Sequence, residues 1–162
     1  MERIIDVANF IFEEYKKISG IVIDEMKLHK LLYFAQRETL AILNEPLFKE
    51  PMEAWDYGPV SPKVRLIYTD NGLVGDNFKS ISSQHAYIVK DIILQYGSLA
   101  SWKLSEMSHQ EVSWLNARKT GSKKAQMSLE DIKEDAKHVR PYDSFYDMYY
   151  DEFDNVEDTN DR

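Results

Sequence analysis

The chain has 162 residues, of which 43% are hydrophobic and 30% are charged, and it contains no cysteine. This length suits one domain with a sizeable core, and the composition excludes wholesale disorder. Without cysteine there are no disulfides, thiolate zinc sites or cysteine nucleophiles. No apolar run approaches the roughly 20 residues of a membrane span, and the start, MERIIDVANF, lacks the apolar middle of a signal peptide. We therefore expect a cytoplasmic protein that does not enter a membrane.

The net charge of −8 is unevenly distributed. Residues 143–162 carry eight carboxylates and one arginine, so this segment contributes −7 and leaves −1 for the rest of the chain. The body is thus electrically balanced and the end is an acidic appendage. Because nucleic-acid binding requires a basic face, we expect no direct contact with DNA or RNA.

The first two predicted elements are helices. Apolar residues recur at helical spacing over residues 3–19, and Gly20 can supply a left-handed cap. Asp24 is a candidate N-cap for a second helix over residues 24–43, which is apolar on nearly every side. A helix of that kind must be buried, so we expect it at the centre of the fold.

The next segment combines a short strand with a rigid turn. Pro46 ends the central helix, and large and small side chains alternate over residues 52–57 with the period of a strand. Gly58-Pro59 predicts a fixed turn, and Ser61-Pro62 is a strong helix start signal for a helix that runs to about residue 69.

Three further helices are predicted in the second half of the chain, over residues 84–96, 101–108 and 128–139. After His109 a turn leads to Trp114 and Arg118. The expected fold is therefore mainly α: a compact single-domain multi-helix bundle around the buried helix 24–43, with at most a small β element near residues 52–57.

The C-terminal part is treated separately from this helical domain, which we assign to residues 1–140. Over residues 141–154, acidic residues alternate with an aromatic stripe at helical spacing, which predicts a helix, and residues 155–162 read as a disordered tail. This helix could dock on the domain or bind a partner. The aromatic residues are Tyr142, Phe145, Tyr146, Tyr149 and Phe153.

Motifs of catalysis and cofactor binding are not found in the sequence. There is no HExxH, no phosphate-binding loop and no GxSxG, so we expect no metal, no cofactor and no enzyme. His109 and Glu111 lie two residues apart and could form a base with its orienting carboxylate, with Arg118 nearby. The competing interpretation is a buried histidine that fixes the turn before Trp114.

Two features are suited to binding. Trp55 and Tyr57 lie beside Gly58-Pro59, and large rings on a fixed backbone make good interface anchors, although either ring could instead belong to the core. The second feature is a cluster of basic residues around Gly121, which could meet phosphate or an acidic partner, the acidic end of the chain, or only solvent.

Several blocks in series resemble the Panacea antitoxin domain, a family also described as SocA-like or phage-associated GepA-like proteins. Order and spacing agree from about residue 24 to residue 118, while Ser108 and Ser113 depart from the pattern, which favours threonine and proline there. The acidic aromatic end lies outside the pattern. The matching blocks are KLHKLLYFAQ, PLF, EAWDYGPVSP, YG, LSEMSHQEVSW and AR.

The resemblance implies a helical antitoxin of a bacterial or prophage toxin–antitoxin system. It would neutralise a cognate toxin by direct contact, and we expect the adjacent gene to encode that toxin. The resemblance implies no cofactor and no established catalytic residue. The alternatives are an adaptor that delivers a protein to a cytoplasmic Clp-type protease, a phage regulatory protein, and an enzyme that uses His109 and Glu111. The residues expected to bind a partner or to determine shape are Lys30, Trp55, Tyr57, Gly58, Pro59, His109, Glu111, Trp114 and Arg118.

Overall fold

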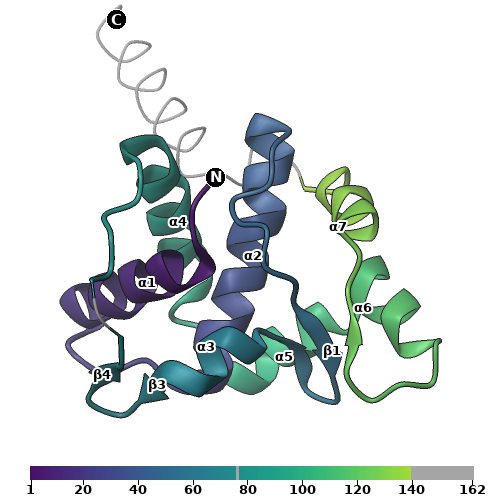
Figure 1. The fold of residues 1–162 in the computed structure, drawn as a ribbon, viewed down its shortest axis with the longest axis horizontal. Coiled ribbons are helices and arrows are strands. Elements are labelled where there is room, and N and C mark those ends of the chain that lie inside the picture. The colour runs from purple at the N-terminus through teal and green to yellow at the C-terminus, as the bar shows by residue number, and fades with distance from the viewer. Residues whose placement is uncertain (76, 140–162) are drawn as a thin grey trace, which may run out of the picture.

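The fold is built around one buried helix, α2 (Glu25–Leu43), as predicted (Figure 1). The computed structural model describes residues 1–75 and 77–139, so the predicted segments 141–154 and 155–162 lie outside the described residues. The Asp24 carboxylate accepts a hydrogen bond from the Lys27 amide at 2.8 Å and thereby caps the first turn. Asn44 ends the helix in the left-handed conformation, with φ of 56°.

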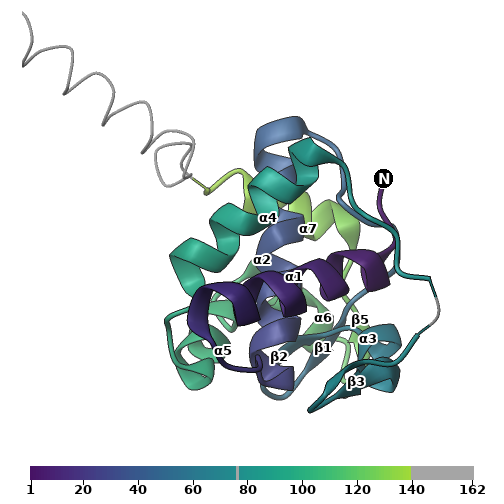
Figure 2. The same ribbon diagram turned by 90° about the vertical axis from the view of Figure 1, so that its left-hand side faces the viewer.

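Helices cover α2 on several sides (Figures 1 and 2). On one side, α1 and α4 pack against α2 and against each other, and on the opposite side lie α6 and α7. The short helices α3 and α5 close the lower end in the view of Figure 1. Their bounds are α1 Ile4–Ser19, α3 Pro62–Ile67, α4 Ser83–Tyr96, α5 Ser101–Ser108, α6 Val112–Arg118 and α7 Leu129–Ala136.

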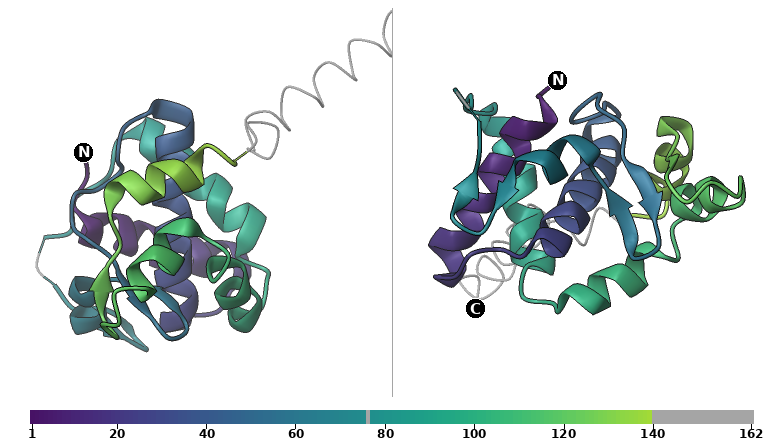
Figure 3. Two further views of the ribbon diagram at one scale, coloured as in Figure 1. Left: turned by 90° about the vertical axis from the view of Figure 1, so that its right-hand side faces the viewer. Right: turned by 60° about the horizontal axis from the view of Figure 1, so that its bottom comes forward.

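A small antiparallel sheet lies at one end of α2, and its central strand is β1 (Glu53–Trp55). β1 pairs on one edge with β2 (Gly58–Val60) and on the other with β5 (Ala125–Gln126). A separate hairpin joins β3 (Tyr68–Thr69) to β4 (Gly72–Leu73). The right-hand view of Figure 3 brings the end of the molecule with this hairpin and α5 toward the reader.

The predicted mainly α architecture is confirmed, with differences at the ends of elements. The helix that starts at Pro62 ends at Ile67, and α7 ends at Ala136 rather than near residue 139. Gly58-Pro59, expected as a rigid turn, forms a strand paired with β1. Residues 112–118, for which only a turn was predicted, form the helix α6.

The core is contributed mainly by α1, α2 and α4. Tyr33 and Phe34 of α2 are fully buried, and the Phe34 ring stacks on Tyr96 with centroids 4.7 Å apart. The helix also buries polar side chains, including Lys27, Lys30 and Glu38. Because a buried polar group is costly unless it is paired, these residues mark positions with a specific structural or functional task.

Candidate functional site

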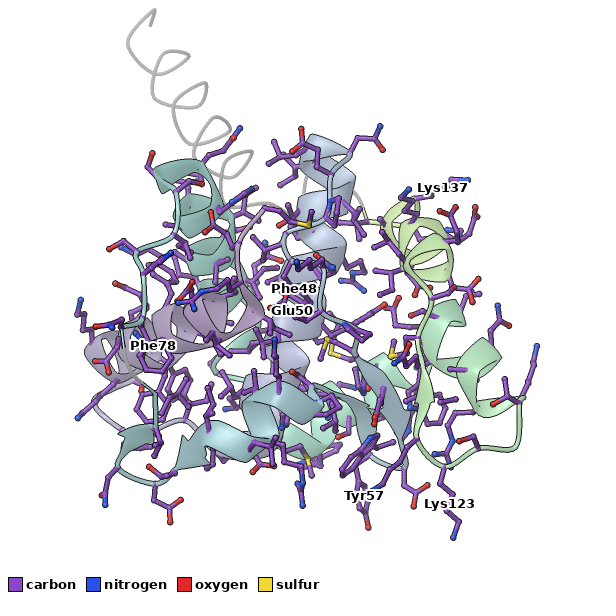
Figure 4. The ribbon with its side chains drawn as sticks, in the orientation of Figure 1. Phe48, Glu50, Tyr57, Phe78, Lys123 and Lys137 are labelled. Carbon is purple, nitrogen blue, oxygen red and sulfur yellow. The ribbon has the colours of Figure 1, made fainter. Side chains whose placement is uncertain are left out.

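The β1–β2 hairpin presents one aromatic side chain to the solvent. Trp55 pairs with Gly58, so Asp56 and Tyr57 form a two-residue turn between the strands. The Tyr57 side chain is 68% exposed and points away from the fold at the lower edge of Figure 4. This exposed ring on a tight turn is the first element of the candidate site.

Two helices fix the backbone of this turn. Ser105 of α5 donates its hydroxyl hydrogen to the Tyr57 carbonyl at 2.7 Å. Lys30 of α2 donates from its amine to the Pro59 carbonyl at 3.1 Å. The turn that carries Tyr57 is thereby held in place without any partner present, which reduces the entropy lost on binding.

Gly58 allows the hairpin to approach α2 and α5 closely. Its φ of +113° is a conformation that side chains rarely adopt, and the residue is buried. A β-carbon built there would overlap Ser108 Oγ and would lie 2.6 Å from Lys30 Cε. Only glycine fits this position.

Helix α6 holds the other side of the hairpin. Trp114 donates its indole N–H to the Trp55 carbonyl at 2.8 Å. Arg118 donates to the Ala54 carbonyl at 3.2 Å and to the Asp56 carboxylate at 2.6 Å. Trp114 and Arg118 therefore support the hairpin backbone and the turn.

The pairing of His109 as a base with Glu111, one of the two interpretations left open by the sequence, is not seen in the described structure. The His109 ring stacks on Trp114 with centroids 4.3 Å apart, and burial lowers the pKa of His109. Glu111 instead forms an ion pair with Arg37 of α2 and accepts a hydrogen bond from the Tyr33 hydroxyl at 3.0 Å. The two side chains therefore have separate roles: His109 packs against Trp114, and Glu111 connects the start of α6 to α2.

A buried polar network joins α2, α6 and α7 around Tyr33. Its one hydroxyl hydrogen is shared between Glu111 and the Asp135 carboxylate, whose oxygen lies 2.8 Å away, and that carboxylate accepts hydrogen bonds from the Val112 and Ser113 amides at 2.7 and 3.1 Å. Burial raises the pKa of Glu111; Asp135 nearby adds to the rise and Arg37 opposes it. The network fixes the first turn of α6, and hence Trp114, relative to the central helix.

A pocket of about 330 Å³ opens beside Tyr57. Trp55 forms part of its wall, and the Arg65 guanidinium and the Lys124 amine lie 5.1 and 4.9 Å from the centre of the Trp55 ring. In Figure 4, Lys123 and Tyr57 both point outward at this end of the molecule. The lining residues are Glu25, Met26, His29, Lys30, Trp55, Asp56, Tyr57, Val60, Arg65, Lys123 and Lys124.

The structure thus brings most of the predicted site residues together at one hairpin. Trp55, Tyr57, Gly58 and Pro59 form it, and Lys30, Trp114 and Arg118 bind its carbonyl groups. His109 reaches this cluster through Trp114, whereas Glu111 belongs to the Tyr33 network. The predicted tail residues lie outside the described residues.

Some residues of the site were not predicted from the sequence, notably His29, Arg65 and Ser105. A usable signal existed for His29, because it is a polar residue in a helix that is otherwise apolar on nearly every side. Arg65 and Ser105 lie on helix faces that look ordinary in sequence, and only the fold brings them to the hairpin.

The described part of the chain contains no cluster of three or more histidine, aspartate or glutamate side chains that could hold a metal ion. Among the same residues, no helix is both long and apolar enough to cross a membrane.

Comparison with known proteins identifies the family. The Antitoxin SocA-like, Panacea domain family matches residues 28–115, more than half of the chain, and the chain belongs to this family. The matched range includes the whole hairpin and Trp114. No solved structure matches the chain.

One curated relative is Antitoxin SocA of Caulobacter vibrioides (strain NA1000 / CB15N). The two sequences are 38% identical over 66 residues, which is 41% of this chain and 35% of the relative. The chain therefore matches about a third of the length of that protein.

Proposed function

We propose that this chain is an antitoxin that neutralises a toxin protein by binding it directly, with the Tyr57 turn as the centre of the contact surface. Membership of the SocA-like antitoxin family supports the role, and the antitoxin name of the relative from Caulobacter agrees with it.

The observation that carries the proposal is the contrast between the Tyr57 ring and its backbone. The ring is exposed, while the Tyr57 carbonyl and the strands beside it receive hydrogen bonds from Ser105, Lys30 and Trp114. A large exposed ring on a preorganised backbone is the usual chemistry of an interface anchor, and it has no evident use in stabilising the monomer. Trp102 of α5, 69% exposed, adds a second ring to the same end of the molecule.

A growth assay tests this function. The chain is co-expressed with the product of the neighbouring reading frame, and we expect the neighbour alone to stop growth and the pair to restore it. Tyr57→Ala should abolish the rescue at equal expression, because truncation of a central aromatic anchor removes much of the binding energy. Tyr87→Ala, which truncates an exposed tyrosine of α4 outside the pocket lining, is the matched control and should rescue as the wild type does.

Two results would contradict the proposal. One is a neighbouring product that is not toxic alone or that is not rescued by the wild-type chain. The other is full rescue by Tyr57→Ala, which would leave the antitoxin role but remove the turn from the contact surface.

A further inference from the structure

Lys30 is a buried cation that no carboxylate contacts directly in the described part of the chain. Its side chain is 1% exposed, and its hydrogen bond is to a neutral acceptor, the Pro59 carbonyl. Among residues 1–75 and 77–139, Lys30 forms no ion pair. Burial lowers its pKa to about 8, a fall that the nearby Asp24 and Glu25 carboxylates oppose, so the amine is still mostly protonated at neutral pH. A buried charge that lacks a partner is costly, and an anion that entered the pocket beside it would remove that cost.

His29 adds a second donor to the same pocket. The residue is 1% exposed, and its Nδ1 accepts a hydrogen bond from the Ser61 amide at 3.2 Å. In the neutral ring the proton therefore lies on Nε2. This atom is buried and makes no hydrogen bond within the described structure, although the Glu25 carboxylate lies 3.4 Å away. Burial lowers the pKa of His29 to about 3, which keeps the ring neutral and Nε2 a donor.

The charges of the lining favour a single negative group. The two carboxylates of the pocket already have cationic partners: Arg65 binds Glu25 at 2.9 Å, and Arg118 binds Asp56 at 2.6 Å. In the described part of the chain, Lys123 and Lys124 form no ion pair, and they join Lys30 in the lining. The pocket thus has an excess of positive charge in a chain whose net charge is −8.

We propose that this pocket binds the carboxylate of an acidic side chain that a protein partner inserts beside Tyr57. Lys30 supplies the countercharge, His29 Nε2–H donates a hydrogen bond, and the rings of Trp55 and Tyr57 cover the methylene groups of the inserted side chain. The inference deepens the proposed function, and it rests on that function for the partner being the toxin.

A carboxylate fits this site better than a phosphate or a nucleic acid. Glu25 and Asp56 remain in the lining and would repel a doubly charged phosphate more strongly than a single charge. A nucleic acid would in addition meet the acidic charge of the whole chain. One singly charged group is the anion that the pocket accommodates.

A titration with small probes tests the pocket without any toxin. Full-length protein labelled with ¹⁵N is titrated with N-acetylglutamate methylamide and, separately, with the corresponding glutamine compound. The signal followed is the Trp55 indole N–H resonance, assigned with Trp55→Phe. The acid should shift this resonance saturably and the amide should not, because only the acid carries a negative charge that can form an ion pair with Lys30.

Variants connect the shift to the proposed residues. Lys30→Met retains the length and apolar character of the side chain and should weaken binding of the acid by about tenfold or more. Lys124→Gln, at the exposed rim, should weaken it by about threefold, and it keeps the test valid if Lys30→Met does not fold. Lys90→Met, an exposed lysine of α4, removes the same charge elsewhere and should leave binding unchanged.

Any of four results would overturn the inference. In the titration these are equal shifts with the acid and the amide, or no shift with either. The other two are wild-type binding of the acid by Lys30→Met and tighter binding of inorganic phosphate than of the acid. Wild-type affinity of Lys30→Met for the neighbouring gene product would remove the pocket from the interface and leave the proposed function standing. Conversely, specific binding of the acid without any toxin rescue would support the pocket and contradict the proposed function.

Discussion

The side chain of Lys30 lies directly against Gly58, so that a β-carbon on this glycine would come within 2.6 Å of Lys30 Cε. This contact joins the central helix to the hairpin, and the Lys30 amine extends it by binding the Pro59 carbonyl. The position of the exposed Tyr57 ring is therefore set by a contact between two buried residues. Changes at either residue should affect the hairpin first.

Gly58→Ala should lower the free energy of unfolding by about 3 kcal/mol, because it combines an unfavourable positive φ with overlap against Ser108 and Lys30. Urea denaturation followed by circular dichroism measures the change. Gly20→Ala is the matched control: its φ is also positive, at +76°, but there is open space around it. That substitution should cost about 1 kcal/mol. Equal decreases in the free energy of unfolding for Gly58→Ala and Gly20→Ala would show that the close contact at Gly58 does not contribute to stability.

Lys30→Met should change the stability at pH 7 by no more than about 1 kcal/mol, because the loss of one hydrogen bond is offset by removal of a buried charge. The comparison with wild type should depend on pH. The folded pKa of Lys30, about 8, is below the ordinary value of 10.5, so the unfolded chain binds more protons between these values and the wild type gains stability as pH rises through this range.

The expected gain of wild type over Lys30→Met reaches about 3 kcal/mol at the upper end of the range, and below pH 8 the difference should be constant. Urea denaturation of both proteins between pH 7 and about pH 10 measures it. A difference independent of pH would mean that the amine titrates normally and is not confined as the structure shows.

Asp135→Ala should lower the free energy of unfolding by about 3 kcal/mol, because it leaves the Val112 and Ser113 amides without their acceptor and removes the shorter hydrogen bond of the Tyr33 hydroxyl, which keeps Glu111 as an acceptor. Hydrogen exchange should accelerate most at the first turn of α6. The control Glu134→Ala removes an exposed carboxylate of the same helix, whose ion pair with Lys137 should be worth about 0.5 kcal/mol or less. Unchanged exchange at Val112 in Asp135→Ala would contradict the assigned role.

The central helix and most of the other helices could be predicted because their signals are local. Asp24 was predicted as a cap, Ser61 as part of a helix start signal and residue 128 as the start of a helix, and each of Asp24, Ser61 and Ser128 accepts a hydrogen bond from the amide three residues later. Because α2 is apolar on nearly every side, it was predicted to be buried, and it is buried in the structure. These features depend on neighbours within one or two turns, which a sequence pattern reveals.

The features that could not be predicted depend on distant partners. The first turn of α6 has no cap from its own N-terminal neighbour Glu111, and its amides are bound instead by Asp135 of α7. The strand β5 has two residues, too few for a period, and it exists only because Ala125 pairs with Ala54 of β1.

The candidate site shows the same division. The rings and the Gly58-Pro59 pair were identified as a binding feature from the sequence, and the structure places Tyr57 outside and Trp55 half-buried. The pocket itself combines α2, the hairpin, α3 and the loop at Lys123 and Lys124, so no single stretch of sequence contains it.

One affinity tests the central claim most directly, that of the purified chain for the product of the neighbouring gene. Isothermal titration calorimetry measures it for wild type, Tyr57→Ala and Tyr87→Ala. We predict that Tyr57→Ala weakens binding by at least about tenfold while its melting temperature and the affinity of Tyr87→Ala stay at the wild-type values. Equal affinities of wild type and Tyr57→Ala, in a complex that forms, would contradict the claim that the hairpin turn is where this protein meets its partner.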